Sequence, residues 1–308
     1  MSFASRLALL FLAACIAHAE PTPAFPATGA PMPRFIIDRW VNSPPLQPET
    51  LRGKVVLVDF WEYTCVNCIR TLPYVKAWHA TYAPVGLVVV GVHAPEFEFG
   101  KRAENIDRGI RDHGLTYPIA IDNDFSTWTA YRNQAWPAKY LFDAQGKLSG
   151  VWLGEGEYPE IENKIRELLV QAGARTLPPV TAEVKAYKDL PFDTEITPET
   201  YLGTARREGD GVARVGAWKS EAEYVEHVGD EPAKLVLDFR GGEVNLVLQP
   251  GPETSHLLVK LDGKDLGPTT IDRSGMYRLV HDAGNRRHGL ELETKDPGLR
   301  AYAFTFGP

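Results

Sequence analysis

The sequence predicts two globular domains: an α/β domain with a mixed central sheet and helices on both faces, and then an all-β sandwich or jelly roll. In the first half, continuous apolar runs alternate with segments that have the spacing of amphipathic helices. Beyond about residue 190, short strand-like segments follow one another between Gly, Pro and Asp turns, with no helical pattern between them. The 308 residues are enough for two such domains.

The core of the α/β domain is predicted from two apolar runs. Val55–Val58, within a strand at 55–60, is continuously apolar, as is typical of a strand that is buried on both faces. Residues 85–92 predict a second strand of this kind. Between them, apolar side chains recur at helical spacing from Cys65 onward, at Val66, Ile69, Leu72, Val75, Trp78 and Tyr82. We therefore expect a strand, a helix and a parallel strand.

The other elements of this domain follow from shorter patterns. Residues 101–113 are charged with Ile106 and Ile110 four apart, which indicates a surface helix. The remaining elements are predicted as a short strand at 35–37, a strand at 116–121, a helix at 125–131, a hairpin of 138–142 and 148–153, and a closing helix at 161–170. In the β domain, strands are predicted at 235–239, 244–248, 256–261, 276–280, 289–293 and 301–306.

Changes in composition divide the chain into five predicted segments. These are a signal peptide at 1–19, a flexible tether rich in Pro and Ala at 20–34, the α/β domain at 35–175, a linker at 176–189 and the β domain at 190–308.

The signal peptide is predicted from Arg6, the apolar run that follows it, and the small residues Ala17 and Ala19 of a cleavage site. Leu12–Cys15 also resembles a bacterial lipobox, in which Cys15 would carry a lipid anchor. Both alternatives predict export, most simply to a bacterial periplasm.

The net charge and the positions of the cysteines exclude some classes of function. The formal net charge of −7 leaves no basic patch and excludes nucleic acid as a partner. Cysteines occur only at positions 15, 65 and 68. Because Cys15 lies in the leader, the exported chain keeps a single pair, which excludes a disulfide scaffold. No cofactor is predicted.

Cys65 and Cys68 form a Cys-x-x-Cys motif where a strand leads into a helix. The helix amides and dipole favour the thiolate of the first cysteine. A thiolate attacks a disulfide, and a second thiol one turn away resolves the mixed disulfide. We therefore predict Cys65 as the nucleophile and Cys68 as the resolving thiol. A zinc site is the weaker alternative, since a structural site needs four ligands and no second pair exists.

Residues 35–172 resemble the thioredoxin superfamily, most closely its exported TlpA-like branch. The resemblance is carried by Val58–Trp61 before the motif, Cys65–Cys68 itself, Pro73 in the following helix, and Trp136–Pro137. It implies a thioredoxin-like fold.

Two further stretches are similar to DipZ proteins, in which a β domain resembling a carbohydrate-binding module follows the redox domain. These stretches are Thr64–Val75 and Ile196–Gly203. DipZ proteins also carry a polytopic membrane domain that this sequence lacks, so we expect a separate membrane protein to donate electrons.

The resemblance implies an exported thiol–disulfide oxidoreductase that reduces disulfide-containing protein substrates. By position, Asp59 would accept the proton of Cys68. Trp136 and Pro137 would help to bind the client chain, with a cis peptide bond before Pro137. The Val66–Asn67 dipeptide differs from the Gly-Pro of ordinary thioredoxins, which leaves the redox potential open; the resemblance favours a reductant.

The other polar and aromatic residues are assigned ordinary structural roles. Glu62 is expected to be a charge at the rim of the site, and His93–Glu98 a solvated loop. In the β domain, core packing is the default for the aromatic residues, although a sugar-stacking platform is an alternative for Trp218, Tyr224, Tyr277 and Tyr302. The alternative function is accordingly a protein that binds a glycan or an envelope protein, with a secondary redox domain.

Overall fold

The computed structural model describes residues 25–188, 195–206 and 211–308. The predicted signal peptide and Cys15 lie outside these residues. Within the described ranges, no helix combines the length and the apolar character needed to cross a membrane.

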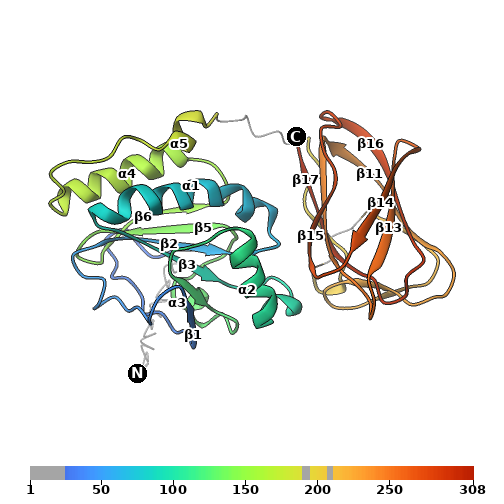
Figure 1. Cartoon of the computed structure of the whole chain (residues 1–308), viewed down its shortest axis with the longest axis horizontal. Helices are drawn as coiled ribbons and strands as arrows, with labels where there is room; N and C mark the ends of the chain where they lie inside the picture. The colour runs from blue at the N-terminus through green and yellow to red at the C-terminus, as the bar shows by residue number, and fades with distance from the viewer. Residues whose placement is uncertain (1–24, 189–194, 207–210) are drawn as a thin grey trace, which may run out of the picture.

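The first domain is built on a six-stranded mixed sheet in the order β1-β4-β3-β2-β5-β6 (Figure 1). The strands are β1 (Arg39–Val41), β2 (Val55–Trp61), β3 (Leu87–His93), β4 (Ile119–Ile121), β5 (Ala138–Phe142) and β6 (Leu148–Leu153). Parallel pairing joins β2, β3 and β4, whereas β1, β5 and β6 are antiparallel to their neighbours. The predicted α/β fold is confirmed.

Helices cover both faces of this sheet. They are α1 (Val66–Tyr82), α2 (Ala103–Asp112), α3 (Ser126–Ala130), α4 (Tyr158–Gln171) and α5 (Ala182–Ala186). Along β2, Leu57 and Trp61 pack in the core with α1, α2 and α4, while Val58 and Phe60 pack in a second core near α3. The continuous apolar run of β2 therefore reflects a strand with two buried faces.

The described part of the predicted tether differs from the expectation. The backbone of residues 29–32 pairs with the β5–β6 hairpin, through Gly29 N–H to Leu148 C=O and Met32 N–H to Gly146 C=O. Residues 35–37, which were predicted as a short strand, do not form one. Phe35 is buried in the core, and the edge strand begins at Arg39 instead. The hairpin thus recruits a segment whose composition alone suggests flexibility.

The predicted linker also packs on the first domain, around the buried carboxylate of Glu162. This carboxylate accepts hydrogen bonds from the Trp78 indole, the Tyr82 hydroxyl, and both the backbone amide and hydroxyl of Thr181. Glu162 therefore joins α1, α4 and the start of α5 at one point.

Glu162→Ala is expected to destabilise the protein by about 3 kcal/mol, because it leaves several buried donors without an acceptor. Chemical denaturation monitored by tryptophan fluorescence measures this loss. Glu167→Ala, on an exposed position of the same helix, is the matched control and should change stability by less than about 0.5 kcal/mol. Equal effects of the two variants would contradict the role given to Glu162.

The second domain consists of two antiparallel sheets, as predicted. One has the order β15-β12-β17-β10-β9, with β7 added beside β17, and the other has the order β14-β13-β16-β11-β8. The strands are β7 (Thr200–Tyr201), β8 (Ala213–Val215), β9 (Trp218–Ser220), β10 (Val225–His227), β11 (Ala233–Gly241), β12 (Glu243–Gln249), β13 (Ser255–Leu261), β14 (Lys264–Ile271), β15 (Gly275–Val280), β16 (Arg286–Thr294) and β17 (Arg300–Gly307). Their inner faces share one core.

Each of the six predicted strands is present, and the strands that the sequence did not reveal are short or at the edge. β14 is the longest of these; it is mostly exposed and contains Gly267 and Pro268, which conceal its pattern. Its pairing with β13 along most of its length makes it a strand.

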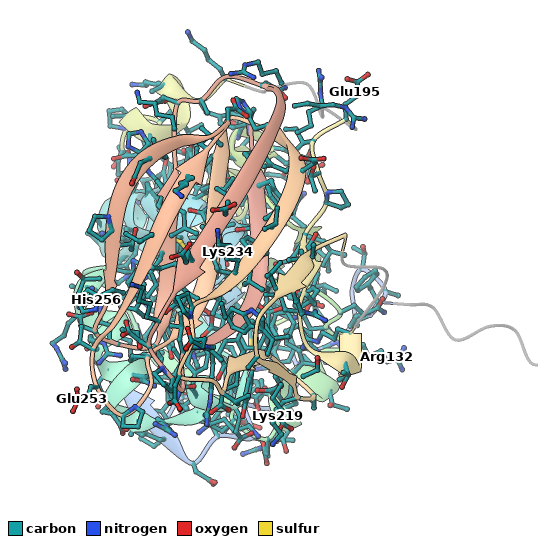
Figure 2. All side chains as sticks on the ribbon, turned by 90° about the vertical axis from the view of Figure 1, so that its right-hand side faces the viewer. Arg132, Glu195, Lys219, Lys234, Glu253 and His256 are labelled. Carbon is teal, nitrogen blue, oxygen red and sulfur yellow. The ribbon has the colours of Figure 1, made fainter. Side chains whose placement is uncertain are left out.

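The sheet that contains β12, β15 and β17 faces the first domain, and the other sheet faces outward (Figure 1). On the outward face, Lys234 lies in the middle of the sheet (Figure 2) and forms ion pairs with Glu291 and Glu293. Lys260 joins the same ladder through Glu291. The centre of this face therefore carries paired charges.

Aromatic residues join the two domains. Tyr302 of β17 is buried against Phe97 and Phe99 of the first domain, with ring centroids 4.9 Å apart in both pairs. Tyr224 packs against Tyr302 and lies under the Arg300 guanidinium. Two of the four aromatic residues considered for a sugar platform are thus part of the domain junction, where core packing explains them.

Candidate redox site

The two cysteines lie at the start of α1, directly after β2. Cys65 is the N-cap residue of α1, and its sulfur accepts a hydrogen bond of 3.2 Å from the Cys68 amide. The Cys68 thiol donates to the Cys65 sulfur over 2.7 Å, and the two are not joined as a disulfide. Cys65 is partly exposed and Cys68 is buried. This asymmetry suits an attacking thiol and a resolving thiol.

The acidity of Cys65 differs from the prediction. Burial raises the pKa of the Cys65 thiol, and the carboxylates of Glu96 and Glu62 raise it further, whereas the hydrogen bonds from Cys68 lower it. The helix terminus does stabilise a thiolate, as expected. Burial and the two acidic neighbours, which the sequence did not place here, outweigh it. The sequence therefore predicted the position of Cys65 at the helix start correctly and the direction of its pKa shift wrongly.

Cys68 is held more strongly in its protonated form. Burial raises the pKa of the Cys68 thiol well above its usual value, and the adjacent Cys65 sulfur and the Asp59 charge raise it further. A group that removes this proton is therefore needed for resolution.

Asp59 is the carboxylate that faces this region, and it is completely buried. It lies in β2 on the same face as Leu57 and Trp61, directly opposite Lys139 of β5. The Lys139 ammonium, also buried, lies 3.7 Å from the carboxylate. Burial raises the pKa of Asp59 to about 6, and the Lys139 charge limits the rise. A carboxyl that titrates near neutrality can accept and return a proton.

Lys139 was not among the predicted site residues. Its sequence neighbours are apolar, and a lysine in a strand is normally assigned to the surface. The signal available in the sequence was the position of Lys139, two residues after Pro137. In the structure, the β2–β5 register pairs Lys139 with Asp59.

Trp136 and Pro137 lie directly before β5, and the peptide bond between them is cis, as predicted. The Trp136 indole donates a 3.0 Å hydrogen bond to the carbonyl of Ala94, directly after β3. This contact links the cis-proline segment to the β3–α2 loop. The binding of client chain by Trp136 and Pro137 remains a prediction.

The expectation of a rim charge at Glu62 is wrong, and the expectation of a solvated loop at His93–Glu98 is wrong for His93. Glu62 is 1% exposed and His93 0%. The Glu62 carboxylate accepts hydrogen bonds from the amide and hydroxyl of Thr64, and its other oxygen lies 3.8 Å from His93 Nε2. Both side chains are therefore enclosed at the strand end, whereas Glu98, farther along the loop, is exposed.

Arg70 also contacts the β domain. It forms ion pairs with Glu155 at 3.3 Å and with Glu243 of β12 at 3.2 Å. No group of three or more His, Cys, Asp or Glu side chains suited to a metal ion occurs in the part of the chain that the structure describes.

Comparison with known proteins agrees with this geometry. Residues 28–151 match the AhpC/TSA family, and residues 210–307 match the family described as the thioredoxin-like C-terminal domain. The first domain is thus thioredoxin-like in fold, as predicted. The second match covers most of the β domain.

Similarity to individual proteins extends over both domains. Protein DipZ of Mycobacterium bovis is 36% identical over 300 residues, which cover 88% of this chain and 42% of that protein. The chain thus spans less than half the length of this relative. The thiol-disulfide oxidoreductase YkuV of Bacillus subtilis is 28% identical over 142 residues, which cover 46% of this chain and 95% of that protein.

Proposed function

We propose that this protein is a thiol–disulfide oxidoreductase that reduces disulfides in protein substrates. The observation that carries the proposal is the pair of sulfurs 2.7 Å apart at the start of α1, with Cys65 partly exposed and Cys68 buried. Similarity to the thiol-disulfide oxidoreductase YkuV supports the same chemistry.

In the proposed reaction, the Cys65 thiolate attacks one sulfur of the substrate disulfide. The substrate S–S bond breaks, a mixed disulfide forms, and the released substrate thiolate takes a proton. Cys68 then gives its proton to Asp59, and its thiolate attacks the Cys65 sulfur. The second substrate thiol leaves, and two electrons have passed from the dithiol to the substrate. A partner dithiol must reduce the new Cys65–Cys68 disulfide before another turnover.

The surroundings of Cys65 favour reduction of substrates over their oxidation. Strongly oxidising dithiols stabilise their thiolate, which makes the reduced form more stable. Here burial and the carboxylates of Glu96 and Glu62 disfavour the thiolate. The reduced pair is therefore a better electron donor than a pair with an acidic first cysteine.

We further propose that the protein acts outside the cytosol, in a bacterial periplasm, because residues 1–19 have the pattern of an export signal. A membrane protein that supplies electrons fits this location. The β domain would orient clients or localise the enzyme.

The equilibrium potential of the dithiol tests the direction of the reaction. Equilibration with thiol–disulfide buffers, read by mass spectrometry of alkylated protein, should give a value near or below about −270 mV. A value near about −120 mV would indicate an oxidant and contradict the proposed direction. Reduction of an insulin-type disulfide by the reduced chain, with one Cys65–Cys68 disulfide formed per substrate disulfide, tests the reaction itself.

A further inference from the structure

Glu96 is a buried carboxylate of the first domain that the proposed reaction does not use. Its side chain is 8% exposed, and it lies in the loop between β3 and the 3₁₀ turn Glu98–Lys101. The Tyr201 hydroxyl of β7 donates to Glu96 Oε1 over 2.5 Å, and Arg206 Nη1 donates to the same oxygen over 2.8 Å. Both partners belong to the β domain.

Arg206 makes further contacts with both Glu96 and Tyr201. Arg206 Nη2 also approaches the Glu96 carbonyl at 3.4 Å, and its guanidinium stacks over the Tyr201 ring at 5.0 Å. A hollow of about 100 Å³ lies at the same junction of the domains, lined in part by Glu96, Tyr201 and Arg206. The β domain therefore holds this carboxylate by charge, by hydrogen bonds and by packing.

The fold places the Glu96 loop beside the dithiol. β2 and β3 are parallel neighbours in which Trp61 pairs with His93, so the segments that follow them emerge at the same edge of the sheet. The Ala94 amide donates to the Trp61 carbonyl over 3.2 Å. Gly100 closes the loop against Glu62, and a Cβ there would meet Pro95 at 3.1 Å and Glu62 Oε1 at 3.3 Å. The loop after β3 is thus packed on the segment that leads into Cys65.

We propose that the β domain sets the reactivity of Cys65 by holding the charge of Glu96 with Arg206 and Tyr201. In this role, Arg206 and Tyr201 are positioning residues that act on the dithiol from another domain. The inference rests on the proposed function only in taking Cys65 as the nucleophile. It gives the β domain an electrostatic role in the redox site that requires no ligand.

The direction of the effect follows from the charges around Glu96 and Cys65. These charged and titratable groups are Glu62, Glu199, Tyr201, Arg206 and Cys68. The Glu96 carboxylate opposes formation of a negative charge on Cys65. Arg206 offsets that carboxylate, so at a pH where Glu96 is ionised with or without Arg206, the loss of Arg206 should make the thiolate rarer. Loss of the Glu96 charge should make the thiolate more common, because the opposing charge is gone.

Two variants of the full chain, in its reduced form, test the proposal. They should shift the alkylation rate of Cys65 in opposite directions. The measurement is the rate at which iodoacetamide alkylates Cys65 across a range of pH, with the modified residue identified by mass spectrometry. At the alkaline end of the pH range, where Glu96 is ionised, Arg206→Gln should slow alkylation by about 3- to 10-fold, and Glu96→Gln should accelerate it by a similar factor, since one pKa unit changes the thiolate fraction tenfold. The assay needs no turnover, so it remains valid even if the proposed function fails.

The control is Arg273→Gln, which removes a different ion pair between the domains, with Asp112 at 3.9 Å. It should leave the alkylation rate unchanged. Simple loosening of the domain junction would expose Cys65 and accelerate alkylation in both test variants. Shifts in the same direction, or no shift in either variant, would overturn the proposal; opposite shifts with an unchanged control would support it.

Discussion

Cys65→Ser is expected to abolish catalysis: the variant should reduce substrate disulfides no faster than they are reduced without protein. The substitution replaces the sulfur that attacks the substrate with a hydroxyl, which does not form the mixed disulfide. Serine is close in size, and Cys65 is partly exposed, so the fold should be retained. An insulin-type reduction assay with a regenerating dithiol measures the loss.

Cys68→Ser is the matched variant, because it keeps the attacking thiol and removes only the resolving one. It should react once and then accumulate as a mixed disulfide with the substrate, visible on a non-reducing gel. Turnover by Cys65→Ser at the parent's rate would refute the assignment of the nucleophile. Sustained cycling by Cys68→Ser would refute the order of attack and resolution.

Asp59→Asn is expected to slow resolution of the mixed disulfide by about 100-fold, because an amide cannot accept the Cys68 proton. Since the pKa of Asp59 is about 6, resolution by the parent should accelerate as pH rises through about 6. The variant should lack this inflection. Rapid mixing with a disulfide substrate, followed by acid quenching, measures the decay of the mixed disulfide.

The control is Asp38→Asn, at an exposed position away from the dithiol. It should keep the parent's rate and pH profile. An inflection near pH 6 that survives in Asp59→Asn would assign proton transfer to another group.

The same Asp59→Asn variant should also change how stability depends on pH. Folding raises the pKa of Asp59 from 3.8 to about 6, so the folded state binds the proton more tightly than the unfolded state. The parent therefore loses stability as pH rises from about 4 to about 6, and the loss is complete above that range. The variant lacks this loss, so its unfolding free energy relative to the parent should grow by about 2 kcal/mol between pH 4 and pH 7.

This prediction concerns the change with pH and not the offset between the two proteins, since the variant also leaves Lys139 without its counter-charge. Urea denaturation at several pH values measures the difference. A difference that stays constant from pH 4 to pH 7 would show that Asp59 does not titrate there.

Local patterns were sufficient for most of the architecture. The apolar run at Val55–Val58 and the helical spacing after Cys65 report burial of their own segments, so β2 and α1 could be predicted directly. Short strand-like segments between Gly, Pro and Asp turns predicted six strands of the sandwich. This pattern missed β14, because an exposed edge strand buries too little to impose a pattern.

Within the redox site, the sequence pattern determined the dithiol and its place at a helix start, because these features depend on neighbours within a few residues. The cis bond before Pro137 and the role of Asp59 were predicted from the resemblance to the thioredoxin superfamily. The tertiary structure alone decided the partner of Asp59 and the acidity of Cys65. The physical reason is that electrostatic effects depend on distance and burial, and both are set only when β5 lies beside β2 and the β domain packs on Glu96.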